Sequence, residues 1–457
     1  MTKSEETQSL VEQALKVASR HGEAVVRGQD ILRHQIRISN SEIDIFKQWR
    51  SRVLAVFVAV DGRIGTTEII DPTPKSLQTR IDHLISFVRG LQPTPLFSGL
   101  QKEFRSPSKV EQLYDKRIRE FPERAPEVVA ASLDEAQKAG AKRTAGSFFF
   151  DEIVTDLSTS EGFRGDYRAS SYRMTLRSFV DPESSGQGIA VGRVLNDIEA
   201  QLSRAGRESG EIASLAVGGK QGKPGTYDLV LHPTVAASIL GALIKGANPV
   251  QILMGNSPLK DRIGQQLGPE TVTIWDDGTI PNGLGSAPFD FEGTPTQRTQ
   301  IIRKGTLEQL VHNTSSSRML QTKSTGNCQL AQFFIGSKLM IPGPTNIVFK
   351  QGEQSFEELL EPARPTIYVT SNWYLRYTSA LEGTFSTIPR DGMFLIEKGE
   401  IGQPIQKLRI TDNLVRMLGA IDGLGREVRQ IRWWEVNTPT FIPFIRIRDV
   451  SMTAATQ

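Results

Sequence analysis

The N-terminal part of the chain shows two helix-like hydrophobic patterns around a block of strand-like ones. The first helical pattern consists of Leu10, Val11, Ala14, Leu15 and Ala18, and the second of Leu77, Ile81, Leu84, Ile85 and Val88. Between them lie the strand-like runs EAVVR, ILRHQIRIS, SEIDIFKQ and SRVLAVFVAV, then a DGR hairpin turn and IGTTEII. This order predicts a helix-flanked antiparallel sheet unit over residues 1–91.

Two further units follow the first. Residues 92–109 have the Pro and Ser content of a linker. Residues 110–209 combine helix-like segments with two long strand-like runs joined at EGFRG, which predicts a middle α/β unit. A second linker is expected at 210–225, and a larger mixed β-rich domain at 226–451 with similar hairpins in IIRKGTLEQL and LIEKGEIGQP. The predicted fold class is therefore α+β.

The segment LHPTVAASILGALIKGANPVQ, residues 231–251, predicts a helix without chemical groups. Pro233 suits the first turn and Gly246 the C-terminal end. Between them the residues are small or apolar, apart from Lys245. His232 is the only candidate ligand beside this helix, and a capping or surface role is the favoured interpretation.

Composition and charge narrow the class of protein. Of 457 residues, 38% are apolar and 23% charged, as in soluble proteins, and no run is long enough to span a membrane. The single cysteine, Cys328, excludes an internal disulfide and a Cys-rich zinc site, and it fits a reducing cytosol. The N-terminal segment lacks the pattern of a signal peptide. A net charge of +3 does not by itself indicate nucleic-acid binding.

Several short motifs are weak signals of chemistry. None of the five histidines lies three to five residues from another, so the helical metal-binding pair is absent. SPSK and SPLK have the spacing of a serine nucleophile and lysine base, but chance explains both. GQGIAVG and GGKQGKPG complete no phosphate-binding pattern, and flexible loops are expected there.

Four carboxylates flank a glycine-rich stretch in WDDGTIPNGLGSAPFDFEGTPTQR. Asp276, Asp277, Asp290 and Glu292 could collect a hard cation or share acid and base roles. Asp and Gly are also the commonest turn residues, and an ordered structural loop is the favoured interpretation.

The C-terminal segment REVRQIRWWEVNTPTFIPFIRIRDV mixes five arginines with aromatic residues. Such a mixture can bind single-stranded nucleic acid or form a protein interface. The alternation of Ile and Arg from Ile445 to Arg448 instead favours a half-buried strand with a solvated face.

The chain resembles the TldD/PmbA family. The resemblance rests on TVTIWDDGTIPNGLGSAPFDFEGTPTQRTQIIRKGTLEQLVHNTSSSRMLQTKSTGN, with NSPLKDRIGQQL before it and GMFLIEKGEI after it. LYDKRI and VDGRIGTTEI fit earlier regions, so the likeness covers nearly the whole chain. The positions it marks as structural or groove-loop candidates are Asp276, Asp277, Gly283, Ser286, Asp290, Glu292, Ser324, Thr325, Gly326 and Asn327.

The resemblance implies paired subunits of a cytosolic zinc protease, in which the TldD-type subunit carries His-Glu-x-x-x-His on the helix matching residues 240–246. Gly241 and Gly246 stand here at the histidine positions and Ala242 at the glutamate position. No C-terminal cysteine is present either. The chain is therefore similar to the PmbA type, also called TldE, with no catalytic or metal-binding residue of its own.

We expect a non-metal subunit of a cytosolic heterodimeric metallopeptidase that acts on unfolded peptides, peptide precursors or antitoxins. Zinc would belong to a TldD-type partner, and the isolated chain would hydrolyse peptides at a negligible rate. The alternative is a metal-free homodimer that binds peptides or a partner. Neither a membrane nor nucleic acid is an expected partner, although relatives have been linked by name to DNA gyrase.

Overall fold

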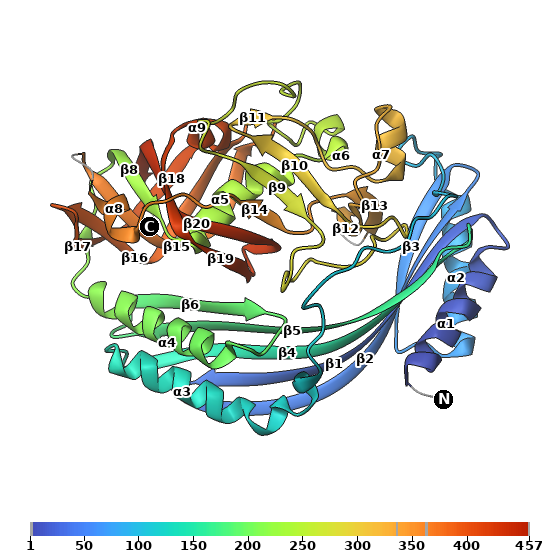
Figure 1. The fold of residues 1–457 in the computed structure, drawn as a ribbon, viewed down its shortest axis with the longest axis horizontal. Helices are drawn as coiled ribbons and strands as arrows, with labels where there is room; N and C mark the ends of the chain where they lie inside the picture. The colour runs from blue at the N-terminus through green and yellow to red at the C-terminus, as the bar shows by residue number, and fades with distance from the viewer. Residues whose placement is uncertain (1–2, 335–336, 362–363, 456–457) are drawn as a thin grey trace.

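The computed structural model describes residues 3–334, 337–361 and 364–455. Its N-terminal half contains one curved antiparallel sheet in the order β3-β2-β1-β4-β5-β6 (Figure 1). The strands are β1 (Glu23–Ser39), β2 (Glu42–Val60), β3 (Arg63–Ile70), β4 (Arg143–Thr159), β5 (Arg164–Phe179) and β6 (Ser185–Gly192). The helices are α1 (Lys3–Ala18), α2 (Pro74–Arg89), α3 (Ala125–Lys138) and α4 (Ile198–Leu215), with short 3-10 turns at Lys116–Arg119 and Phe121–Glu123.

The strands expected in separate N-terminal and middle units belong to this single sheet, because β1 pairs with β2 on one side and β4 on the other. The helix-flanked antiparallel sheet is confirmed, and the boundaries at 1–91 and 110–209 stay predictions. The runs EAVVR and ILRHQIRIS join into β1. The polar residues between them have partners in the fold, since Asp30 forms ion pairs with Arg50 at 2.5 Å and Arg52 at 3.4 Å.

Strand alternation gives the sheet two different faces. Even-numbered residues such as Val26, Phe148 and Tyr172 pack against α1 and α2 at one end and α3 and α4 at the other. Odd-numbered residues such as Phe57 and Leu157 face the C-terminal half, where they meet Phe289, Phe291 and Cys328 among others. Figure 1 shows these helices on the outer side of the curved sheet and the C-terminal half on its inner side.

The glycines of GQGIAVG form strand β6, so the flexible loop expected there is wrong. A Cβ added to Gly188 would lie 1.9 Å from the carbonyl oxygen of Ala205, and one added to Gly186 would lie 2.2 Å from that of Ser209. Both oxygens belong to α4, so these glycines let the helix backbone lie directly on the strand. Residues 210–215, expected in a linker, continue α4.

The C-terminal half is built on a mixed sheet, 12-stranded in the part of the chain that the structure describes. β20 lies near its centre, antiparallel to β8, β18 and β19 and parallel to β14. The strands are β7 (Lys220–Gln221), β8 (Gly225–Leu231), β9 (Ile274–Asp277), β10 (Arg298–Arg303), β11 (Thr306–Leu307), β14 (Ile347–Phe349), β15 (Thr366–Ser379), β16 (Thr384–Glu397), β17 (Glu400–Gln406), β18 (Leu408–Asn413), β19 (Ile421–Trp433) and β20 (Val436–Ala454). A separate hairpin consists of β12 (Cys328–Phe334) and β13 (Ser337–Pro342), and the helices are α5 (Pro233–Lys245), α6 (Pro249–Leu253), α7 (Thr314–Met319), α8 (Phe356–Leu360) and α9 (Leu414–Gly419).

The two Lys-Gly hairpins are confirmed as β10–β11 and β16–β17. In both turns the lysine and the glycine have positive φ, 46° and 80° at Lys304 and Gly305 and 54° and 81° at Lys398 and Gly399. That pair of angles is the one a tight hairpin turn requires. No helix within the described residues is long and apolar enough to pass through a bilayer.

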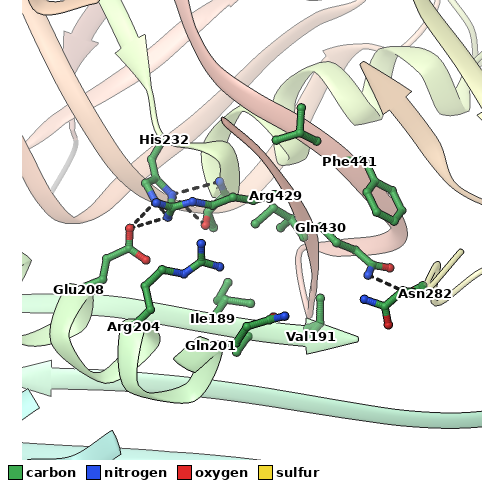
Figure 2. Close-up of a pocket in the computed structure, with 14 residues that line it drawn as sticks. Ile189, Val191, Gln201, Arg204, Glu208, His232, Asn282, Arg429, Gln430 and Phe441 are labelled. Carbon is green, nitrogen blue, oxygen red and sulfur yellow. Dashed lines mark hydrogen bonds and ion pairs between the residues drawn. The ribbon is translucent and has the colours of Figure 1, made fainter. Parts of the chain in front are cut away.

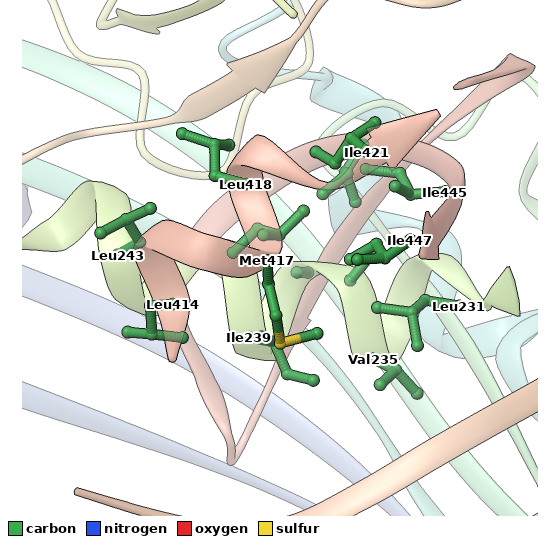
Figure 3. Close-up of a cluster of buried hydrophobic side chains, with 14 of the residues drawn as sticks. Leu231, Val235, Ile239, Leu243, Leu414, Met417, Leu418, Ile421, Ile445 and Ile447 are labelled. Carbon is green, nitrogen blue, oxygen red and sulfur yellow. The ribbon is translucent and has the colours of Figure 1, made fainter. Parts of the chain in front are cut away.

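Helix α5 is buried on nearly every side, which its apolar composition requires. Val235, Ile239 and Leu243 pack against α9 and the central strands, where Met417 and Ile447 lie (Figure 3). The predicted helix ends are confirmed, with Pro233 in the first turn and Gly246 at the C-cap. His232 is the N-cap, since its side chain accepts a hydrogen bond from the Thr234 amide, so the capping role is confirmed.

Candidate functional site

Helix α5 carries the positions that the resemblance marks for metal ligands, and none of them bears a donor side chain. Gly241 is buried, and a Cβ added there would lie 3.4 Å from the Thr440 Oγ1, an ordinary contact. A Cβ added to Gly246 would lie 2.8 Å from the Ser257 Oγ and 2.9 Å from the Leu243 carbonyl oxygen. The first position therefore has room for a methyl group, whereas the second is closed.

These residues do not fit a zinc ion. Protein zinc sites take three or four ligands from His, Cys, Asp and Glu side chains, and α5 contains none of these residue types. Throughout residues 3–334, 337–361 and 364–455, no three such side chains gather in a group that could hold a metal. The side chains of α5 therefore supply no ligand for a metal-dependent step.

Asp276 is buried at the end of β9 and holds the segment before β14. Its carboxylate accepts hydrogen bonds from the Thr345 amide at 2.6 Å, the Asn346 amide at 3.0 Å and the Asn327 Nδ2 at 2.6 Å. Burial raises the pKa of Asp276 to about 7, against the lowering effect of these donors. The neighbouring Asp277 accepts from the amide of Thr279 and closes a turn.

Asp290 and Glu292 form a second buried pair. Asp290 accepts hydrogen bonds from the amides of Glu292, Thr294 and Cys328, each at 2.9 Å. Glu292 accepts from the amide of Thr314 at the start of α7, while its Oε1 has no partner among the described residues. Burial raises the pKa of both carboxyls, and the pKa of Asp290 is raised further by Glu292. Because at least one carboxylate oxygen of each accepts a hydrogen bond from a backbone amide, we propose that all four acidic residues shape the loop.

The loop between Asp277 and Asp290 is held in place by Arg193, which directly follows β6, and by Gln430 of β19. The guanidinium of Arg193 donates to the carbonyl oxygens of Gly283 at 2.6 Å and Ser286 at 3.2 Å. The Ser286 Oγ donates to Ile280 and accepts from Asn346, which ties this loop to the neighbourhood of Asp276. The loop candidates Gly283 and Ser286 thus lie at the boundary between the two halves of the chain.

The Ser-Thr-Gly-Asn segment fixes the backbone of His312. The amide and the hydroxyl of Thr325 both bond the His312 carbonyl oxygen, at 3.1 Å each, and the Ser324 hydroxyl reaches the same oxygen at 3.4 Å. Gly326 has a φ of 70°, and a Cβ there would lie 2.3 Å from the Pro295 carbonyl oxygen, so the turn requires glycine. Asn327 then links the segment to Asp276.

We expect His312 to make folding sensitive to mild acid. It is 5% exposed, and burial lowers its pKa to about 4, whereas an unfolded imidazole titrates near about 6.5. Between these values only the unfolded chain takes up the proton, so this contribution is complete above pH ~6.5 and is lost as the pH falls towards ~4. Urea denaturation at several pH values should show a smaller acid loss for His312→Gln than for wild type. A matched His83→Gln change on the exposed face of α2 should keep the wild-type pH slope.

A first cavity, of about 280 Å³, lies where α4, β6, β19 and the start of α5 meet (Figure 2). Glu208 bonds one guanidinium and one imidazole, with its Oε1 2.6 Å from the Arg429 Nη1 and 2.9 Å from the His232 Nε2. Because the His232 Nδ1 accepts the Thr234 amide hydrogen, the neutral ring donates from Nε2 to Glu208. Burial opposes ionisation of Glu208, but His232 and Arg429 beside it hold its pKa well below the usual range.

A second cavity, of about 480 Å³, lies between the inner face of the sheet and the C-terminal half. We call it the arginine cavity, after Arg33, Arg173, Arg193 and Arg432, which line it together with one carboxylate, Asp151. Arg33 and Asp151 form a bidentate ion pair at 2.7 and 3.1 Å across β1 and β4. Loop residues 284–287 form part of the wall, so Ser286 is the predicted candidate that reaches this cavity.

Sequence reasoning missed both cavities. Glu208 is 24 residues from His232, and Arg429 is 197 residues from it, so no local spacing marks the cluster. No local spacing links Arg33 and Arg173 either, because they lie on strands β1 and β5, far apart in the sequence. Arg429 and Arg432 belong to the arginine-rich C-terminal segment, whose pattern does not indicate a cavity.

Two domain models of one family match the chain. The PmbA/TldA metallopeptidase C-terminal domain covers residues 224–454, and the PmbA/TldA metallopeptidase domain 1 covers residues 24–86. The chain is similar over 98% of its length to the crystal structure of TldE from Thermococcus kodakarensis, with a TM-score of 0.81, 18% identity and 99% of that chain covered. It is also similar to a Thermotoga maritima protein described as a modulator of a DNA gyrase, with a TM-score of 0.79, 21% identity and coverage of 98% and 100% of the two chains. At these identities the structures show a shared fold.

Proteins named as metalloproteases are similar in sequence. One from Methanothermobacter thermautotrophicus is 29% identical over 309 residues, which cover 66% of this chain and 65% of that protein. Another, from Methanocaldococcus jannaschii, is 27% identical over 44% of each chain, so the chain spans less than two thirds of the length of both archaeal relatives. Metalloprotease PmbA of Escherichia coli O157:H7 is 25% identical over 386 residues, which cover 82% of this chain and 81% of that one. Because the C-terminal domain model alone matches half of the sequence, the chain belongs to the PmbA/TldD family of metallopeptidases.

Proposed function

We propose that this chain is the metal-free subunit, of the PmbA or TldE type, of a cytosolic heterodimeric zinc metallopeptidase. A TldD-type partner holds the zinc and the general base, and the substrates are unfolded peptides, peptide precursors or antitoxins. The chain contributes wall and binding surface to a shared reaction space.

The observation that carries the proposal is the chemistry of α5. Gly241, Ala242 and Gly246 supply no donor atom from a side chain, and the surroundings of Gly246 leave no space for one. The helix instead packs its apolar side chains into the hydrophobic core of the C-terminal half. A chain with this helix has the fold of its family without the groups that would activate water.

The boundary between the two halves supports a binding role. The first cavity lies at the β6 edge of the sheet and the second on its inner face, and both are lined by polar and charged side chains as well as apolar ones. Together they provide recognition groups without a recognisable nucleophile and base pair. This suits a subunit that positions a substrate for chemistry performed elsewhere.

The alternative is a metal-free homodimer that binds peptides or a partner without cleaving them. A homodimer would contain the same cavities and the same α5, so the two proposals differ only in which chain this protein assembles with. Nucleic-acid binding is disfavoured by the ion pairs of the C-terminal segment, where Arg426, Arg429, Arg446 and Arg448 each bond a carboxylate. Arginines paired in this way do not form an open phosphate-binding surface.

The test is to purify the chain alone and together with a TldD-type partner, and to measure zinc content and cleavage of an unfolded peptide. The chain alone should hold substoichiometric zinc and should not cleave. The complex should cleave, and replacing the glutamate of the partner's zinc motif should abolish cleavage. Zinc-dependent cleavage by this chain alone contradicts the proposal, and a stable homodimer that ignores every TldD-type partner favours the alternative.

A further inference from the structure

The arginine cavity holds more positive charge than the protein itself neutralises. Its lining includes four guanidinium groups and a single carboxylate, Asp151, whose two oxygens are taken by the bidentate pair with Arg33. Arg173 lies 3.7 Å from Asp151, which is too long for a hydrogen bond. Three positive charges therefore remain uncompensated in this cavity.

Arg432 is the exception among the five arginines of the C-terminal segment. The other four pair with Glu208, Glu358, Glu427 or Asp422. Within the described residues, Arg432 pairs with no carboxylate, and its Nε makes one long bond of 3.4 Å to the carbonyl oxygen of Asn437. Burial, together with the positive charge of the nearby Arg173, lowers the pKa of Arg432 to about 10.

Arg193 contributes charge to the cavity rather than free donors. Its guanidinium donates to the carbonyl oxygens of Ser170, Gly283, Leu284 and Ser286, and no carboxylate pairs with it among the described residues. Arg173 and Arg432 therefore retain N–H groups for a ligand. An anion that accepts hydrogen bonds from both guanidinium groups would offset the repulsion between their positive charges.

The rest of the lining indicates what accompanies the anion. Apolar side chains line part of the same space beside polar ones such as Tyr167 and Gln329, and they are Ile153, Ala169, Leu284, Ala287 and Pro439. The volume of about 480 Å³ lies in the range of small-ligand sites and suits one or two amino-acid residues. A carboxylate attached to a residue with an apolar side chain matches this combination.

We infer that the arginine cavity binds the C-terminal carboxylate of a peptide, with Arg173 and Arg432 donating to it and the apolar wall contacting the terminal side chain. The peptide nature of the ligand rests on the proposed function. Planar guanidinium groups match carboxylate oxygens in geometry, and a charge-assisted pair contributes more than a neutral one. The site gives the chain a preference for free peptide ends.

The experiment measures binding of one short unstructured fluorescent peptide, ending in leucine and without acidic side chains, to the full chain without a partner. The peptide is prepared as the free acid, as the C-terminal amide, and as the amide with two internal glutamates. The free acid should bind roughly tenfold more tightly than the amide, and more salt should reduce that difference. Arg432→Gln and Arg173→Gln should each remove most of the difference while leaving the amide unaffected.

The matched control is Arg303→Gln, which removes an equal charge from an arginine that pairs with Glu308 on the exposed surface. It should keep the wild-type preference. Circular dichroism and urea denaturation verify folding, and Arg432→Gln should unfold at the wild-type urea concentration or a higher one, because the change removes a partly buried cation that has no carboxylate partner among the described residues.

Three outcomes would overturn the inference. Equal binding of the free acid and the amide would reject the carboxylate site. It would not contradict peptide binding, and so it would leave the proposed function standing. Binding that follows the internal glutamates assigns the arginines to acidic side chains instead. Absence of binding by all three peptides also rejects the site, whereas the zinc and cleavage measurements decide the proposed function separately.

Discussion

Replacing Glu208 by alanine is expected to lower the free energy of unfolding by about 3–5 kcal/mol, the usual cost of removing one partner from a buried ion pair. Arg429 is largely buried, with a side chain 13% exposed, and its bond to Glu208 is 2.6 Å long. Without the carboxylate, that cation and the Nε2–H of His232 lose their buried acceptor. Urea denaturation of wild type and variant measures the loss.

Glu427 provides the matched control, because it also pairs with Arg429, at 2.9 Å, but its side chain is 52% exposed. Glu427→Ala should cost no more than about 1 kcal/mol, as solvent screens an exposed pair. Glu208→Gln should fall between the two, since the amide keeps an acceptor but not the charge. Equal losses for Glu208→Ala and Glu427→Ala would show that burial of the pair does not decide its contribution.

The second large effect is expected at Gly188, where alanine should destabilise the chain by about 3 kcal/mol, the upper end of the usual cost of overpacking. The added Cβ would lie 1.9 Å from the Ala205 carbonyl oxygen and 2.7 Å from its carbon. Both atoms belong to the backbone of α4, so no change of rotamer relieves the collision, and helix and strand must move apart.

The control for Gly188 is Gly241, which lies inside α5 with an ordinary 3.4 Å contact as the nearest neighbour of an added Cβ. Gly241→Ala should be neutral or stabilising by up to about 1 kcal/mol, because alanine favours a helix over glycine. Adding Ala205→Gly to Gly188→Ala should not rescue stability, since the collision involves the backbone. Rescue by this second change would contradict the explanation.

Local patterns predicted many individual elements. The five apolar residues at helical spacing between Leu77 and Val88 are the buried face of α2. Pro233 and Gly246 bound α5, and both Lys-Gly turns close hairpins. These features depend on contacts between near neighbours in the chain, so the pattern of residues is sufficient to specify them.

Sequence patterns gave wrong or incomplete predictions where the role of a residue depends on contact with a segment that is distant in the chain. The glycines of β6 suggest a loop until α4 is placed on them, and the polar Gly28 to Asp30 interrupts β1 in sequence only. The pairing of β1 with β4 is another such case, because the two strands are more than a hundred residues apart in the chain. A composition shift marks a change of local structure, but it does not say which strands share a sheet.

In the candidate site, too, some features follow from the sequence alone and others depend on tertiary contacts. The sequence by itself determined that α5 has no ligand or base, because a side chain that is absent cannot be supplied by folding, and it determined membership of the family through the acidic and Ser-Thr-Gly-Asn segments. Only the tertiary structure decided that Glu208 pairs with Arg429, and that Arg432 lines the same cavity as Arg173 and Asp151. Charges interact through space over a few ångströms, and which charges come that close depends on how the sheet curves around the C-terminal half.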